Sequence, residues 1–152
     1  MSGLEVIIGP STPAGRIYPR YVSTAGILAV GSREPRPWVY GVDIDGRLVF
    51  DLDSDRRLVN FDLHIPRARW QAQAINSVAV IGRPGDLLFS PNTTRAKSFG
   101  IDLDTKWDSP TRTLLILIGH AKFDVAVALS EQCMGLVADN QLVGFQITGI
   151  EV

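Results

Sequence analysis

Residues 43–62 hold six aspartates, the densest group of side chains in the sequence that could do chemistry. They are Asp43, Asp45, Asp51, Asp53, Asp55 and Asp62. The last four have the spacing of positions one, three, five and twelve of a calcium-binding loop, but Arg56 stands where such a loop needs glycine for its sharp turn. The sequence therefore leaves three interpretations open: a calcium loop, a solvated hairpin end, and an acidic patch for a basic partner.

Histidine and cysteine supply few further candidates. The chain has two histidines, His64 and His120, and one cysteine, Cys133, which do not make up a zinc site of the common His/Cys kinds. We expect no metal and no cofactor. Neither a G-x-S-x-G nucleophile turn nor a glycine-rich phosphate loop occurs in the sequence, so we expect a protein that is not an enzyme. The alternative is a small-ligand-binding domain or a modest enzyme whose pocket uses His64 or His120 as acid or base.

Basic and aromatic residues form another candidate surface. Arg67, Arg69 and Trp70 are close in sequence, and the fold could bring Trp38 and Trp107 beside them. Tryptophan and arginine are the residue types that dominate binding hot spots. The alternative is that these tryptophans pack in the core or at its edge. Trp70 is the member that we assign to a binding surface.

Short β-strands are the elements that must position these residues. About ten apolar segments, several of them alternating with a period of two, are separated by Gly, Pro and Asp turns. Asp45-Gly46 is a strong two-residue hairpin turn. Residues 66–76 begin with a proline and contain three alanines, and they are predicted as the one short helix. The predicted class is mainly β, with an antiparallel curled sheet, sandwich or partly open barrel.

A short hairpin pattern occurs twice in the chain. Residues 52–63 and 136–147 share the core Leu-Val-x-Phe-x-aliphatic after an acidic or amide turn. The residues expected to pack alike are Val59, Phe61 and Leu63 in the first copy and Val143, Phe145 and Ile147 in the second. Because a single hairpin is marginally stable, two such units are expected to stack or to join one sheet. Duplication and chance agreement both explain so short a pattern.

Length, net charge and composition limit the possible domain organisation, partners and location of the protein. A chain of 152 residues is expected to form a single domain, 1–152, with 1–76 and 77–152 as sub-units if the repeat divides it. The net charge of −1 predicts no nucleic-acid partner. No uncharged run reaches the ~20 residues of a membrane span, and a lone cysteine requires no oxidising compartment. We expect a soluble cytoplasmic protein that is a monomer or a weak dimer.

The C-terminal hairpin resembles a widespread bacterial β-meander domain of unknown function. The last turn and strand of that domain have the pattern Asp-x-x-(Gly)-x-Leu-Val-Gly-Ile-Glu-Ile. The residues that match it here are Asp139, Leu142, Val143, Gly144, Phe145 and Ile147. Asn140 replaces the usual turn glycine, and Gln146 replaces the usual acid. The resemblance covers about a quarter of the chain and implies a β-hairpin rather than a reaction.

As a compact β-protein without an active-site motif, the whole chain is similar in type to immunity proteins of bacterial contact-dependent growth inhibition systems. Such proteins bind and neutralise a toxin domain, usually a nuclease, in the cytoplasm. The resemblance implies a cognate protein toxin as the partner. The first hairpin copy carries far more charge than the second, and it is therefore the predicted working surface. The predicted partner-binding residues are Asp51, Asp53, Asp55, Arg56, Arg57, Asp62 and Trp70.

Overall fold

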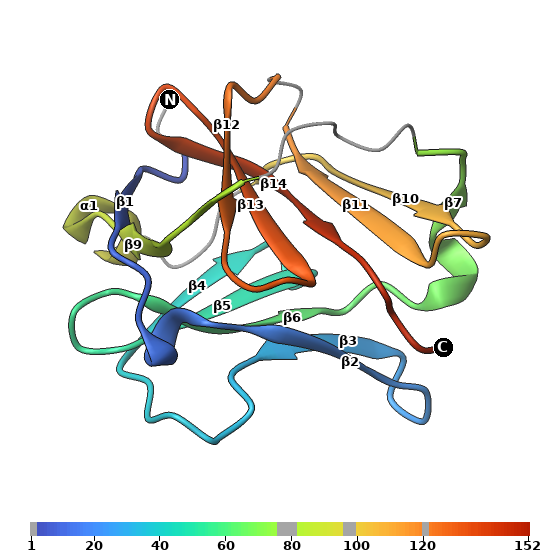
Figure 1. Cartoon of the computed structure of the whole chain (residues 1–152), viewed down its shortest axis with the longest axis horizontal. Helices are drawn as coiled ribbons and strands as arrows, with labels where there is room; N and C mark the ends of the chain where they lie inside the picture. Colours follow the sequence, from blue (N-terminus) through green and yellow to red (C-terminus); the bar gives the residue numbers. More distant parts are fainter. Residues whose placement is uncertain (1–2, 76–81, 96–99, 120–121) are drawn as a thin grey trace.

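The computed structural model describes residues 3–75, 82–95, 100–119 and 122–152, and it consists mainly of β-sheets packed in two layers (Figure 1). The predicted mainly β class, with antiparallel sheets and one short α-helix, is confirmed. Each sheet keeps an edge strand at both ends and does not close into a barrel. No helix among the described residues combines the length and apolar character that a membrane span requires.

The first layer is a five-stranded antiparallel sheet with the strand order β2-β3-β6-β5-β4. Its strands are β2 (Tyr18–Val22), β3 (Ile27–Gly31), β4 (Tyr40–Ile44), β5 (Leu48–Leu52) and β6 (Leu58–Leu63). The turn predicted at Asp45-Gly46 joins β4 to β5, with φ angles of 56° and 70°. Positive φ at both residues matches the right-handed twist of the two strands, so this hairpin prediction is confirmed.

The second layer is a seven-stranded sheet with the order β7-β10-β11-β14-β13-β12-β8. Its strands are β7 (Gln71–Ala72), β8 (Arg83–Pro84), β10 (Leu103–Asp108), β11 (Thr113–Ile118), β12 (Val125–Ala128), β13 (Cys133–Ala138) and β14 (Gln141–Ile147). The short edge strand β7 pairs in parallel with β10, and the short edge strand β8 pairs in parallel with β12. The inner strands pair antiparallel, as predicted. A separate antiparallel pair joins β1 (Val6–Gly9) to β9 (Asp86–Phe89).

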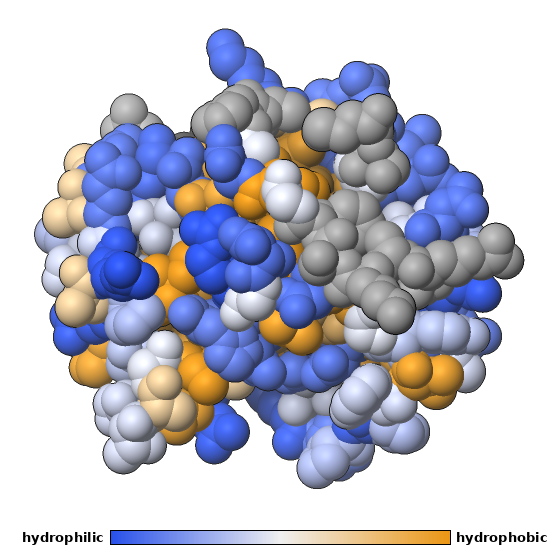
Figure 2. All heavy atoms as spheres, turned by 180° about the vertical axis from the view of Figure 1, so that it is seen from behind, coloured by the Kyte–Doolittle hydropathy of each residue, from blue (hydrophilic) through white to orange (hydrophobic). Residues whose placement is uncertain are grey.

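The hydrophobic core lies between the two sheets. Alternate residues of each strand point into it, which is why strands with period-two patterns form here. Phe61 of β6 stacks on Phe145 of β14, with ring centroids 4.3 Å apart, and Phe50 of β5 contacts Phe145 at 5.9 Å. All three rings are fully buried. Viewed from behind, apolar side chains show between hydrophilic ones near the middle of the molecule (Figure 2).

The two copies of the repeated pattern form hairpins with the same irregularity. In the β5–β6 pair the register passes from Leu52 opposite Leu58 to Asp51 opposite Asn60, so Val59 is an extra, bulged residue. In the β13–β14 pair it passes from Val137 opposite Leu142 to Leu136 opposite Gly144, so Val143 is the extra residue. A bulge turns the strand locally. Consequently Leu58 and Leu142, and not the bulged valines, join Phe61 and Phe145 in the core between the sheets. The prediction that Val59 and Val143 pack there is wrong, and Val143 belongs to a separate small cluster.

The one short α-helix lies outside the predicted range, 66–76. The described part of that range, residues 66–75, forms a single 3₁₀ turn, Arg67–Arg69, and then the extended strand β7, because burial of the large Trp70 ring in the core outweighs the helix propensity of the alanines. The α-helix is α1 (Pro91–Arg95). Proline suits the first turn of a helix, and Ser90 caps it by accepting from the backbone of that turn.

Candidate functional site

The outward side of the five-stranded sheet carries most of the polar side chains that the fold brings together. We call it the polar sheet face, and its residues are Tyr18, Arg20, Asp43, Asp51, Asn60 and Asp62. They come from four strands, and the strand register sets them in two adjacent rows across the sheet. In β4, β5 and β6 the residues that flank them along the strand point into the core, so the period-two pattern separates the polar rows from the buried ones.

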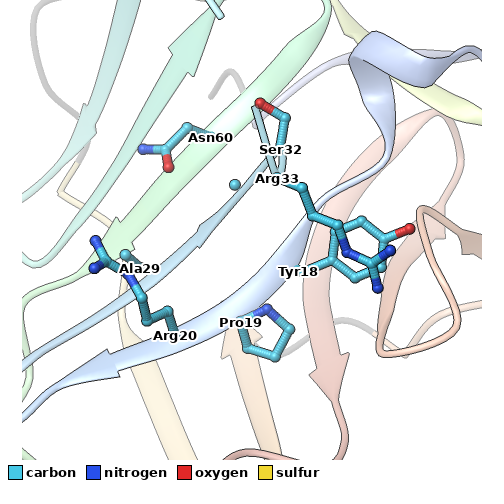
Figure 3. Close-up of a pocket in the computed structure, with 8 residues that line it drawn as sticks. Tyr18, Pro19, Arg20, Ala29, Ser32, Arg33 and Asn60 are labelled. Carbon is cyan, nitrogen blue, oxygen red and sulfur yellow. The ribbon is translucent and has the colours of Figure 1, made fainter. Parts of the chain in front are cut away.

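A pocket of about 290 Å³ opens on this face. Its floor is strand β3, where Ala29 and Gly31 are too small to fill the space between β2 and β6 (Figure 3). A Cβ atom on Gly31 would lie 2.4 Å from the Oδ1 atom of Asn60. Gly31 therefore makes room for the Asn60 amide.

One end of the pocket is built by Tyr18 and Arg33. The Arg33 guanidinium lies over the Tyr18 ring, 3.9 Å from its centroid (Figure 3). Arg16 donates to the Tyr18 hydroxyl at 3.3 Å, and both arginines pair with Glu131, at 3.0 and 3.6 Å. This arrangement places an aromatic ring beside two cations at the surface.

Asp51 and Asp62 give the face its negative charge. The Asp51 carboxylate accepts from Asn60 Nδ2 at 3.0 Å. Partial burial raises the pKa of Asp51, and the nearby Asp62 carboxylate raises it further, while the Asn60 hydrogen bond acts in the opposite direction. Within the described part of the chain, no Lys or Arg forms an ion pair with either carboxylate. The two charges therefore repel one another without an internal cation to offset them.

The other predicted residues of the hairpin turn are bound into an internal network. Asp53 Oδ1 accepts from the backbone amides of Asp55 and Arg57, each at 2.9 Å, and its Oδ2 pairs with Arg57 Nη1 at 2.9 Å. Arg57 Nε donates at 2.8 Å to Asp86, which is fully buried. Asp53 and Arg57 thus hold the turn in shape, whereas Asp55 stays largely exposed, with 72% of its side chain accessible.

Arg56 and Trp70 lie apart from the polar sheet face. Arg56 packs over the ring of Tyr40, 5.2 Å from its centroid. Trp70 is only 6% exposed; its Nε1 donates to the Ile65 carbonyl at 2.9 Å, and its ring contacts Trp107 at 5.2 Å. The structure thus places these two tryptophans in the core and does not gather the tryptophans and arginines into one surface.

The remaining candidates for chemistry are dispersed. His64 is exposed at the end of β6, and its backbone amide donates to the Arg47 carbonyl at 2.7 Å. His120 lies outside the described residues. Cys133 is fully buried, and burial raises the pKa of its thiol far above the ordinary range, which disfavours the reactive thiolate. Among the described residues, no three His, Cys, Asp or Glu side chains are grouped as a metal site requires.

Sequence reasoning missed most of the pocket residues. Tyr18, Arg20, Arg33 and Asn60 are not among the predicted site residues. For Tyr18 and Arg20 the reason is that the prolines around β2 make that segment resemble a loop. The available signal was the alternation of small residues in β3, Ala29 and Gly31. Because Ala29 and Gly31 are two residues apart in a strand, both face the same side of the sheet. Their small size leaves a space that longer side chains of the neighbouring strands can line.

Comparison with known proteins gives no match: neither a protein-family model nor a curated protein sequence corresponds to this chain.

Proposed function

We propose that this protein binds another protein through the polar sheet face, and that it is a toxin-neutralising immunity protein. The observation that carries the proposal is the pair of carboxylates, Asp51 and Asp62, on an open surface without an ion-pair partner among the described residues. A partner that brings a cation to Asp51 removes the repulsion between the two charges. The proposed interface therefore has a built-in electrostatic preference for a basic partner.

A nuclease domain is a partner of this kind. An enzyme that holds a nucleic-acid backbone carries Lys and Arg around its active site. A protein that covers such a site must offer carboxylates in place of phosphates, and Asp51 and Asp62 supply them on a face already flanked by hydrogen-bonding groups. In this proposal the polar sheet face occludes the active site of the toxin.

Tyr18 and Arg33 would anchor the interface. Aromatic and arginine side chains that lie together at a surface are typical hot-spot residues of protein interfaces. The Arg57–Asp53 pair has a supporting part, since it fixes the turn that follows Asp51. Asp55, exposed at that turn, would lie at the rim, where charge affects the association rate more than the affinity.

Two experiments test the proposal at separate levels. The first expresses the toxin domain encoded beside this gene in bacteria with and without the protein. Survival of the cells that contain the protein supports immunity. Equal killing in both cultures would contradict it.

The second experiment measures the affinity of the purified pair by calorimetry. The double variant Asp51→Asn/Asp62→Asn is expected to weaken binding at least tenfold, because it removes charge without changing shape. Its matched control is Asp104→Asn/Asp124→Asn, which removes two exposed carboxylates from the seven-stranded sheet side and should leave affinity unchanged. Immunity with unchanged affinity in both variants would place the interface elsewhere on the molecule.

A further inference from the structure

A second pocket, apolar at its base, lies on the outward side of the seven-stranded sheet. We call it the apolar pocket; its volume is about 460 Å³, within the range of small-molecule sites. Its apolar walls are Leu117, Phe123, Leu136 and Val143. This side of the sheet has its own small hydrophobic cluster, distinct from the core between the layers.

The strand register explains why the sheet is hollow at this point. Leu117 of β11, Gly144 of β14 and Leu136 of β13 lie side by side across three neighbouring strands. Gly144 has no side chain to fill the gap between the leucines, and a Cβ atom there would lie 2.4 Å from the Ile116 carbonyl oxygen. The bulge then places Val143 beside the gap. Backbone geometry thus excludes a side chain from this gap.

The mouth of the pocket is positively charged. Lys106 and Lys122 both line it, against the single carboxylate of Asp104. Within the described residues, neither lysine forms an ion pair. Leu117 and Phe123 are half-buried, so apolar surface is left for a ligand to cover. A cavity with apolar walls and two unpaired ammonium groups at its mouth matches a molecule with an apolar body and one anionic end.

We propose that the apolar pocket binds a small amphipathic carboxylic acid, with its hydrocarbon part against Leu117, Phe123, Leu136 and Val143 and its carboxylate between Lys106 and Lys122. This site is separate from the polar sheet face, because it lies on the other layer of the molecule. The proposed ligand binding at the apolar pocket can therefore be tested independently of toxin binding.

Nuclear magnetic resonance titration of the full ¹⁵N-labelled chain tests the proposal, with sodium octanoate as the probe and 1-octanol as the uncharged control. Octanoate is expected to shift the amide signals of Gly119 and Gly144 saturably at one site, and octanol to bind about tenfold more weakly. Absence of saturable shifts at these glycines, or equal affinity for octanol, would overturn the proposal.

Variants test the two halves of the site separately. Lys106→Gln/Lys122→Gln should weaken octanoate binding about tenfold and leave octanol binding unchanged, whereas Asp104→Asn should strengthen octanoate binding several-fold. Arg83→Gln, an exposed cation on the far edge strand β8, is the matched control and should have no effect. Leu117→Trp should fill the cavity and abolish binding of both probes, with the dispersion of the spectrum reporting that the variant is folded. Unchanged octanoate affinity in the lysine variant, or in a folded Leu117→Trp protein, would refute the assignment.

Discussion

Asp51 is a carboxyl group of the polar sheet face whose pKa the fold changes. Its pKa is raised above the ordinary aspartate value of 3.8, first by burial and then by Asp62. The folded protein therefore holds a proton on Asp51 at pH values where the unfolded chain has already released it. By linkage, the contribution of Asp51 to stability falls as pH rises through the interval that begins near 3.8.

Replacing Asp51 by Asn should show how much stability the folded protein loses when Asp51 becomes charged. The free energy of unfolding of Asp51→Asn, relative to the natural protein, is expected to rise as pH increases from 3 to 7 and to level off above the raised pKa. Urea unfolding at a series of pH values measures it, with the exposed Asp104→Asn as control. A relative stability of Asp51→Asn that is constant or falls with pH would show that the folded protein does not penalise the Asp51 charge.

At the scale of the elements, Asp86 of β9 forms hydrogen bonds with segments that are distant from it in the sequence. Its carboxylate accepts from the backbone amide of Thr12 at 3.2 Å and from Arg57 Nε at 2.8 Å. A Cβ atom on Gly15 would lie 2.1 Å from Asp86 Oδ1, so the 3₁₀ turn at Pro13–Gly15 can approach only because glycine stands there. The first hairpin turn, β9 and the N-terminal segment are thereby fixed relative to one another.

The variant Asp86→Asn should lower the free energy of unfolding by about 2 kcal/mol, because it leaves the partly buried Arg57 without its innermost charge partner. Asp55→Asn is the matched control: it removes a carboxylate 3.8 Å from the same arginine but 72% exposed, and it should cost less than about 0.5 kcal/mol. Chemical denaturation of both variants gives the comparison. Equal decreases in the free energy of unfolding of the two variants would show that the burial of Asp86 does not increase its contribution to stability.

At the scale of the whole molecule, the two similar hairpins meet face to face. Phe61 of the first and Phe145 of the second stack with an interplanar angle of 24°, and one continuous hydrophobic cluster includes residues from both sheets. Such a shared core couples the two layers energetically. The chain is therefore expected to unfold as one unit rather than as separate halves, 1–76 and 77–152.

A double-mutant cycle tests this coupling. Phe61→Leu and Phe145→Leu should each destabilise the protein, and their combined effect should differ from the sum by about 0.5–1.5 kcal/mol because the rings touch. Phe123, which packs in the outer cluster, supplies the control cycle with Phe61, where the effects should add. Fluorescence and circular dichroism should follow a single transition in every variant. Two transitions would assign separate stability to the two halves.

Local structure was largely predictable from the sequence. The period-two patterns gave most of the strands, Asp45-Gly46 gave its hairpin, and the shared Leu-Val-x-Phe core correctly marked Phe61 and Phe145 as buried. These features depend on neighbours along the chain: backbone φ and ψ preferences, and the alternation of side chains in an extended strand. The predicted helix is an exception, since burial of Trp70 overrode the helix propensity of the residues around it.

The candidate sites were decided by tertiary structure. Asp51 and Asp62 lie outward while Asp53 is bound by Arg57, although all three aspartates look alike in the sequence. Tyr18 and Asn60 line one pocket because β3 lies between β2 and β6, and the gap at Gly144 exists because β11 and β13 flank β14. Pairing between distant strands follows from the packing free energy of the whole core, which no local pattern contains.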